Sequence, residues 1–191
     1  MPVLKHNSTG KRIYFIHIPR TAGRFVGGNL TMNGFELVGD NNKFVDGVEI
    51  VHFHRKLYEK HLRVRGIPHF TIVRNPIDRF FSASSIASLD FEQSYIEDWN
   101  NFNKEISKKD DTNWLRPQHE FISSKTQIWK YENGFGKDFC NWISDTLSFP
   151  FNIKSLDYTK VYVKDKFKKT KTLIDNIRKF YKKDFEVFKY V

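Results

Sequence analysis

The sequence predicts one α/β domain over residues 1–191, with a central parallel β-sheet flanked by helices. The first observation is an unbroken apolar run at residues 13–16, continued at Ile18, which is typical of a strand buried on both faces, as in parallel sheets. The second is that this run and another at residues 68–73 each end in a short turn that leads into a helix-compatible segment. A chain of 191 residues is long enough for one substantial core.

The net charge of +10 is unevenly distributed, which indicates a basic patch for an acidic partner. Residues 154–191 contain twelve Lys or Arg against five Asp or Glu, a balance of +7. Residues 90–111 contain seven acidic against three basic residues, a balance of −4. Nucleic acid, an anionic polysaccharide and a phosphate-rich cofactor all suit such a patch, and so does a solvated helical face.

The single cysteine, Cys140, excludes an intramolecular disulfide, and its aromatic neighbours indicate a small core residue rather than a nucleophile. The first twelve residues lack the apolar stretch of a signal peptide, and no run approaches the ~20 apolar residues of a membrane-spanning helix. We therefore expect a soluble, cytoplasmic protein without a membrane span. Residues 1–11 are expected to form a flexible N-terminal segment.

The turn at residues 19–24 follows the first expected strand and precedes a helix-compatible segment at residues 25–30. It combines small residues, a hydroxyl and two guanidinium groups. A strand that ends in such a turn and opens a helix directs backbone N–H groups and the positive end of the helix dipole at one point, where a phosphate can bind. The string GxxxxGK[ST] is absent, so this is not the nucleotide-binding loop of common kinases.

Further along, a short strand is expected at residues 35–38 and another at residues 48–54, followed by a helix at residues 55–62. Strand alternation would place His52 and His54 on the same side. No Cys, Asp or Glu stands nearby at ligand spacing, so we expect no metal site. At the carboxyl end of a strand, a histidine is suited to be a general base, although two polar residues that simply close a strand explain the same pattern.

The strand at residues 68–73 leads directly into a helix, because Asn75 is a good N-cap and Pro76 a good first helical residue. Arg74 stands just before this helix and Ser82 lies two turns into it. A guanidinium and a hydroxyl so placed could both reach a phosphate, provided that another element closes over them.

The remaining elements follow from spacing. An amphipathic helix over residues 95–106 is expected to cover the sheet, followed by a strand at residues 126–132 and a helix at residues 137–147. Apolar residues between 173 and 181 have helical spacing, with a lysine-rich opposite face.

Several of these motifs resemble those of sulfotransferases that use 3′-phosphoadenosine 5′-phosphosulfate (PAPS). Residues 19–24, PRTAGR, resemble the 5′-phosphosulfate loop PKTGGT, and residues 74–82, RNPIDRFFS, match the 3′-phosphate motif R-[DN]-P-x-x-R-x-x-S. The His-x-His at residues 52–54 is similar to that of sulfotransferases acting on uronic acids. Pro117-Gln118 with Glu132 resemble a "pQ" element and its following strand, and the closing segment resembles the Y-x-x-D-F-x-x-F-x-Y pattern of carbohydrate sulfotransferases.

The resemblance implies a sulfotransferase fold, with a P-loop-like strand-loop-helix, and transfer of a sulfuryl group from PAPS to the hydroxyl of an acceptor, expected to be a carbohydrate. It implies that eight residues bind PAPS: Arg20, Thr21, Ala22, Gly23, Arg24, Phe25, Arg74 and Ser82. The implied catalytic residues are His54, His52 and Arg20, with His54 favoured as the base. Three residues could face the acceptor, or form an ordinary polar loop: Arg116, Gln118 and His119.

Arg20 stands where the family has lysine, and Arg24 where it usually has threonine. A planar guanidinium binds phosphate bidentately but does not place its charge as an ammonium does, so an altered enzyme is one reading. The alternative is a non-catalytic protein that binds adenosine bisphosphate, an anionic glycan or nucleic acid on the same scaffold. For the sulfotransferase itself, nucleic acid is not an expected partner. A nucleotide kinase is remote without a Walker lysine.

Overall fold

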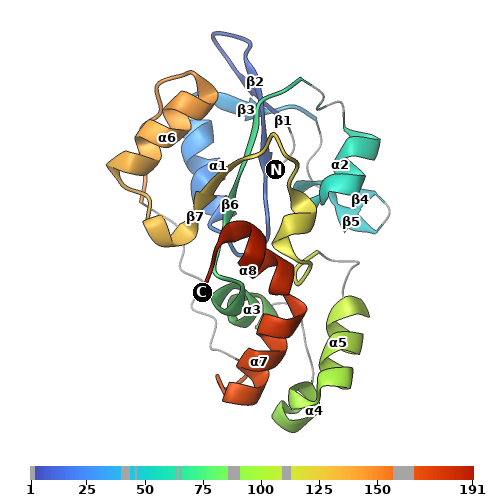
Figure 1. The fold of residues 1–191 in the computed structure, drawn as a ribbon. Coiled ribbons are helices and arrows are strands. Elements are labelled where there is room, and N and C mark those ends of the chain that lie inside the picture. The colour runs from blue at the N-terminus through green and yellow to red at the C-terminus, as the bar shows by residue number, and fades with distance from the viewer. Residues whose placement is uncertain are drawn as a thin grey trace.

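The computed structural model describes residues 3–39, 44–45, 47–62, 64, 66–85, 91–108, 113–156 and 166–191. These residues form a mixed α/β fold around a five-stranded sheet of order β3-β1-β2-β6-β7 (Figure 1). The strands are β1 (Val3–His6), β2 (Arg12–Ile16), β3 (Phe35–Leu37), β6 (His69–Val73) and β7 (Gln127–Lys130). Strands β2, β6 and β7 are parallel, whereas β1 is antiparallel to both β2 and β3.

The prediction of a parallel sheet is therefore correct for β2, β6 and β7 and wrong for β1, which runs antiparallel to both of its neighbours. A tight turn joins β1 to β2, with the Gly10 N–H donating to the His6 carbonyl at 2.9 Å, and so short a connection can join only antiparallel strands. Within the segment expected to be flexible, residues 1–11, the structure places residues 3–6 in strand β1, paired with β2. Val3 and Leu4 are buried in the sheet, and their burial stabilises this edge.

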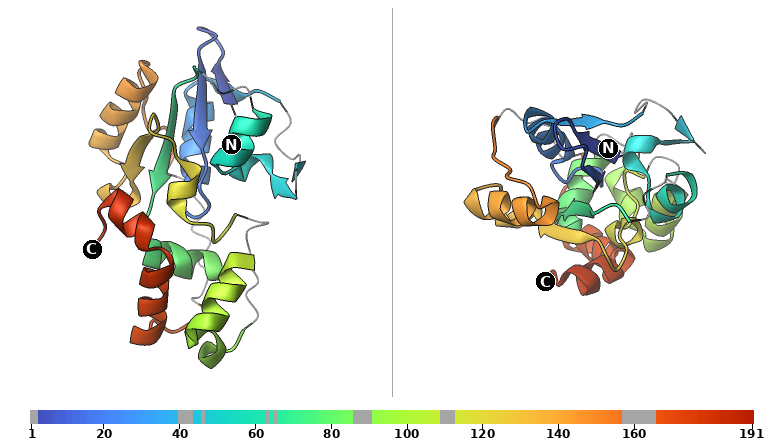
Figure 2. Two further views of the ribbon diagram at one scale, coloured as in Figure 1. Left: turned by 45° about the vertical axis from the view of Figure 1, so that its right-hand side comes forward. Right: turned by 90° about the horizontal axis from the view of Figure 1, so that it is seen from above.

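Helices surround the sheet and extend below it. They are α1 (Gly23–Met32), α2 (Arg55–His61), α3 (Pro76–Ser84), α4 (Gln93–Glu97), α5 (Trp99–Lys108), α6 (Lys137–Leu147), α7 (Lys171–Phe180) and α8 (Lys182–Phe188), with short 3₁₀ turns η1 (Ile50–His52), η3 (Gln118–Phe121) and η4 (Tyr131–Asn133). Helices α1 and α6 lie on one side of the sheet and α2 on the other, while α3, α4, α5 and α7 gather beyond the carboxyl ends of the parallel strands (Figures 1 and 2). None of these helices, in the part of the chain that is described, is long and apolar enough to cross a membrane.

The segment predicted as one helix over residues 95–106 is two helices, α4 and α5, that separate at Asp98. It does not cover the sheet. Phe102 and Ile106 instead pack with Phe80 of α3 and Ile177 of α7 in a core of their own. This helical layer supports α3, which together with the residue before it, Arg74, carries the expected 3′-phosphate motif.

The predicted strand over residues 48–54 is also wrong. Only Val48–Glu49 form a strand there, β5, which pairs with β4 (Phe44–Val45) in a separate two-stranded ribbon. Residues 50–52 form η1, so strand alternation does not relate His52 to His54. A short apolar run does not by itself distinguish a strand from another buried segment, and here Val48 and Phe53 bury themselves against the sheet without joining it.

Candidate anion-binding site

The loop between β2 and α1 has an unusual backbone. Arg20 and Ala22 have φ angles of 69° and 68°, a left-handed conformation that is uncommon for residues other than glycine. Ala22 is the N-cap of α1, where no side chain caps the helix and no acidic residue occupies the first turn. The N–H groups of the first helical residues, Gly23 and Arg24, are therefore placed to bind an anion. Thr21 is buried, and its hydroxyl donates to the Ile18 carbonyl at 2.8 Å, which fixes the turn.

Three arginines gather beside this loop. Arg20 Nε donates to Ser82 Oγ at 2.8 Å, and Arg74 Nη1 lies 3.4 Å from the Arg20 carbonyl oxygen. Burial lowers the pKa of Arg20, and the positive charges of Arg74 and Arg24 lower it further. Within the described ranges, no carboxylate forms an ion pair with any of the three. Their mutual repulsion would be relieved by a bound anion.

An aromatic ring supports the Arg74 side chain. The Arg74 guanidinium carbon lies 4.6 Å from the ring centroid of Tyr131, in the range of a cation–π contact. Tyr131 begins η4 directly after β7, at the same edge of the sheet as Arg74 after β6. Sequence analysis missed Tyr131, although an aromatic residue at the carboxyl end of a parallel strand is a signal that could have identified it.

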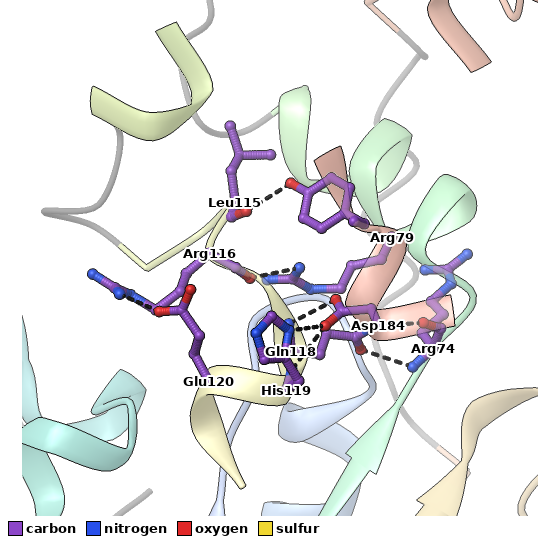
Figure 3. A network of polar contacts seen from close by, with 9 residues as sticks. Arg74, Arg79, Leu115, Arg116, Gln118, His119, Glu120 and Asp184 are labelled. Atoms are coloured by element: carbon purple, nitrogen blue, oxygen red, sulfur yellow. Dashed lines mark hydrogen bonds and ion pairs between the residues drawn. The ribbon is translucent and has the colours of Figure 1, made fainter. Parts of the chain in front are cut away.

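Arg79, the second arginine of the 3′-phosphate motif, is fully buried and tied to backbone. It donates to the carbonyl oxygens of Pro19 at 3.1 Å, Arg116 at 2.9 Å and Trp114 at 3.0 Å. Figure 3 shows its side chain reaching the backbone at Arg116. Arg79 thus connects the β2–α1 loop to the segment before η3, and its role is to hold the loop in place.

The three residues expected to face an acceptor do not share one surface (Figure 3). Gln118 is fully buried, and both ends of its side-chain amide bind the backbone of Arg74, so the side chain is committed to the protein interior rather than exposed to an acceptor. His119 is partly buried, with Nδ1 at 2.7 Å from Asp184 Oδ1. Arg116 points away from Arg74 and pairs with Glu120, with Nη1 at 2.6 Å from Oε2.

Burial lowers the pKa values of the two histidines expected to be catalytic, His52 and His54. His52 Nδ1 lies 3.2 Å from the His17 carbonyl, to which it donates when protonated there, and the His52 ring packs on Trp114. Burial lowers the pKa of His52 to about 4. Burial, and then the positive charge of Arg116, lower the pKa of His54 to about 4. Both imidazoles are therefore neutral at pH 7, but neither has the ordinary pKa that the sequence argument assumed.

His17 is a site residue that sequence analysis missed. Its ring lies directly against Gly23, where a Cβ atom would stand 1.8 Å from His17 Nε2. The same ring is 4.6 Å from the ring of His52, centroid to centroid. His17 therefore joins the base of the β2–α1 loop to the histidine pair. Its position at the end of an apolar run, just before Ile18, was the available signal.

Two hollows on the surface lie outside the arginine site. Hollows of about 410 and 660 Å³ lie away from the arginines, one near Pro68 and Trp142 and the other between α6 and residues 150–156. The described residues contain no group of three or more metal-ligating side chains.

The fold and the site together define a mixed α/β protein with a candidate anion-binding site at the carboxyl ends of its parallel strands. Comparisons with protein-family models, with curated proteins and with solved structures found no match. The function is therefore inferred from the residues of the site rather than from homology.

Proposed function

We propose that this protein is a PAPS-dependent sulfotransferase that acts on a hydroxyl of a carbohydrate acceptor. The observation that carries the proposal is the meeting of Arg20, Arg74 and Ser82 beside the uncapped start of α1. Arg20 belongs to the motif that resembles the 5′-phosphosulfate loop, and the other two belong to the motif that resembles the 3′-phosphate site. Two motifs found far apart in the sequence thus converge on one place.

A donor with two anionic groups suits this arrangement. The N–H groups of Gly23 and Arg24 and the Arg20 guanidinium would bind the 5′-phosphosulfate, whereas Arg74 and Ser82 would bind the 3′-phosphate. Arg24, in the first turn of α1, is exposed and adds positive potential beside the loop. The donor supplies the activated sulfuryl group, and no metal is needed for this chemistry.

The chain's own groups provide the other requirements of transfer. The acceptor oxygen forms a bond to sulfur while the bond from sulfur to the phosphate oxygen breaks, and the acceptor proton passes to a base. We propose that neutral His54 accepts this proton, with His52 orienting the neighbouring segment. Arg20 stabilises the negative charge that develops on the leaving bisphosphate.

A second candidate function is a non-catalytic binder of adenosine bisphosphate. It is favoured by one observation, the commitment of Arg20 Nε to Ser82 at the position where the resembled family has lysine. Binding alone does not distinguish the two functions, because both use the same anion site. Transfer does.

The test is incubation with sulfur-labelled PAPS and a panel of glycans, peptides and small alcohols. Labelled glycan is the expected product, and Arg20→Ala should abolish its formation. Arg55→Ala is the matched control, because Arg55 is exposed and forms its ion pair with Glu59 of the same helix, away from the arginine site. Bisphosphate binding without transfer to any acceptor would favour the second candidate, and absence of both would reject the two functions together.

A further inference from the structure

The described C-terminal segment is connected to the arginine site through a buried carboxylate. Asp184, in α8, is fully buried and accepts three hydrogen bonds, all from η3. Gln118 N donates to Oδ2 at 2.7 Å, and His119 donates to Oδ1 from its backbone N at 2.9 Å and from Nδ1 at 2.7 Å. Such bonds offset the cost of burying a carboxylate, and they fix the start of η3 against α8.

Gln118 passes this constraint to the backbone of Arg74. Its Oε1 accepts from Arg74 N at 2.9 Å, and its Nε2 donates to Arg74 O at 2.7 Å. Figure 3 shows the continuous path from Asp184 through Gln118 to Arg74. Two opposed hydrogen bonds to one residue fix both the position and the direction of the backbone as the chain leaves β6.

A second connection reaches the next residue, Asn75. Its backbone N donates to Glu132 Oε1 at 2.6 Å, and Glu132 Oε2 accepts from the Tyr190 hydroxyl at 2.8 Å. Lys130 lies over the Tyr190 ring, with its Nζ 4.6 Å from the centroid, and so holds the ring against β7. The segment from α8 to Tyr190 thus contacts Gln118, which binds Arg74, and Glu132, which binds Asn75.

We infer that Asp184 and Tyr190 are positioning residues for the anion site: Asp184 acts through Gln118, and Tyr190 through Glu132, to hold the Arg74–Asn75 turn so that the Arg74 guanidinium lies between Tyr131 and the Arg20 carbonyl. Neither residue needs to touch a ligand. The identity of the ligand rests on the proposed function, but the positioning of Arg74 does not. A purely structural role, in which Asp184 only fastens α8 to η3, predicts a different result in the following experiment.

The first measurement is amide hydrogen exchange by NMR on the whole chain without ligand. In Asp184→Asn the Arg74 amide should exchange about tenfold faster or more, as expected when a buried hydrogen bond is weakened. The amides of Phe70 and Ile72, within β6, should keep their rates. Equal acceleration of all three would reveal general destabilisation and overturn the inference, and so would an unchanged Arg74 rate.

The matched control is Tyr181→Phe. It removes a buried hydrogen bond of 2.6 Å between the same C-terminal segment and the Leu115 carbonyl, but that bond does not lead to Arg74. The Arg74 amide should keep its protection relative to β6 in this variant. If Asp184→Asn fails to fold, Gln118→Ala and Tyr190→Phe decide the question, with selective acceleration expected at Arg74 in the first and at Asn75 in the second.

The second measurement is binding of adenosine 3′,5′-bisphosphate and of adenosine 5′-monophosphate by calorimetry. Asp184→Asn should lower the preference for the bisphosphate over the monophosphate about tenfold. The reason is that Arg74 would bind the 3′-phosphate, which only the bisphosphate has. Gln118→Ala should do the same, and the double variant should add little, since both residues belong to one path. An unchanged ratio in both single variants would overturn the inference. If the unmodified protein binds neither nucleotide, the proposed function fails, and the exchange rates still decide whether Asp184 positions Arg74.

Discussion

The Arg20 guanidinium and the Ser82 hydroxyl are joined by a hydrogen bond of 2.8 Å, although 62 positions separate them in the chain. Each belongs to a different expected phosphate site, so the two sites are adjacent parts of one surface. A ligand group bound at one site would therefore lie beside a residue of the other, and the contact leaves the Arg20 Nη groups and the Ser82 hydroxyl proton as donors.

Adenosine 3′,5′-bisphosphate should raise the melting temperature more than ATP or AMP does, because only the bisphosphate offers a 3′-phosphate to Arg74 and Ser82. A ligand that binds only the folded state at a hundredfold excess over its Kd adds about 2.7 kcal/mol to the free energy of unfolding. Thermal unfolding with each nucleotide tests this, and Arg74→Ala should remove most of the difference. Equal shifts from all three nucleotides would contradict the assignment.

Arg20→Lys should keep or increase turnover, whereas Arg20→Ala should abolish it, if the guanidinium serves to neutralise the leaving phosphate. Transfer of labelled sulfate measures both. Equal loss in the two variants would instead show that the contact of the guanidinium with Ser82 is itself required. Appearance of transfer only in Arg20→Lys would identify the natural protein as a non-catalytic binder.

His54→Ala should lower turnover by roughly a hundredfold or more, because base catalysis typically contributes 10²–10⁴. Binding of the bisphosphate should persist. Since the pKa of His54 is lowered to about 4, the rate should stay independent of this group's protonation down to about pH 5. Full activity in His52→Ala, His54→Ala and the double variant would remove both histidines from the mechanism.

Acidification should destabilise the fold through His52. The pKa of His52 is lowered from an ordinary 6.5 to about 4, so the unfolded chain binds the proton more readily than the folded chain between these values. The contribution of His52 is therefore fully present above pH 6.5 and is lost as the pH falls toward 4, on the order of 3 kcal/mol in total. Urea unfolding at several pH values gives the free energy of unfolding as a function of pH. Its fall between pH 6.5 and pH 4 should be less steep in His52→Gln than in the unmodified protein. An unchanged dependence of this free energy on pH would show that groups other than His52 cause it.

Local sequence signals identified the elements that carry the site. Asn75 and Pro76 predicted the start of α3, and the structure confirms it, with Asn75 Oδ1 accepting from Ile77 N at 2.9 Å. The strand-loop-helix at β2 and α1 is likewise confirmed. These features depend on residues a few positions apart, which is why pattern alone was sufficient.

The parts that were missed depend on contacts between distant segments. Strand β1 is only four residues long, and its place in the sheet depends on pairing with both β2 and β3. The path from Asp184 to Arg74 joins three separate segments and leaves no spacing pattern in the sequence. The low pKa of His52 follows from burial, which depends on tertiary packing rather than on its neighbours in the chain.

The close packing of His17 on Gly23 has a consequence for sequence variation. A side chain at position 23 would enter the space that the imidazole occupies, so a change there requires the imidazole to move or a smaller residue at position 17. When diverged homologues are aligned, these two positions should covary, with bulk at one accompanied by its loss at the other. In a genetic screen, His17→Ala should accordingly arise as a suppressor of Gly23→Ala.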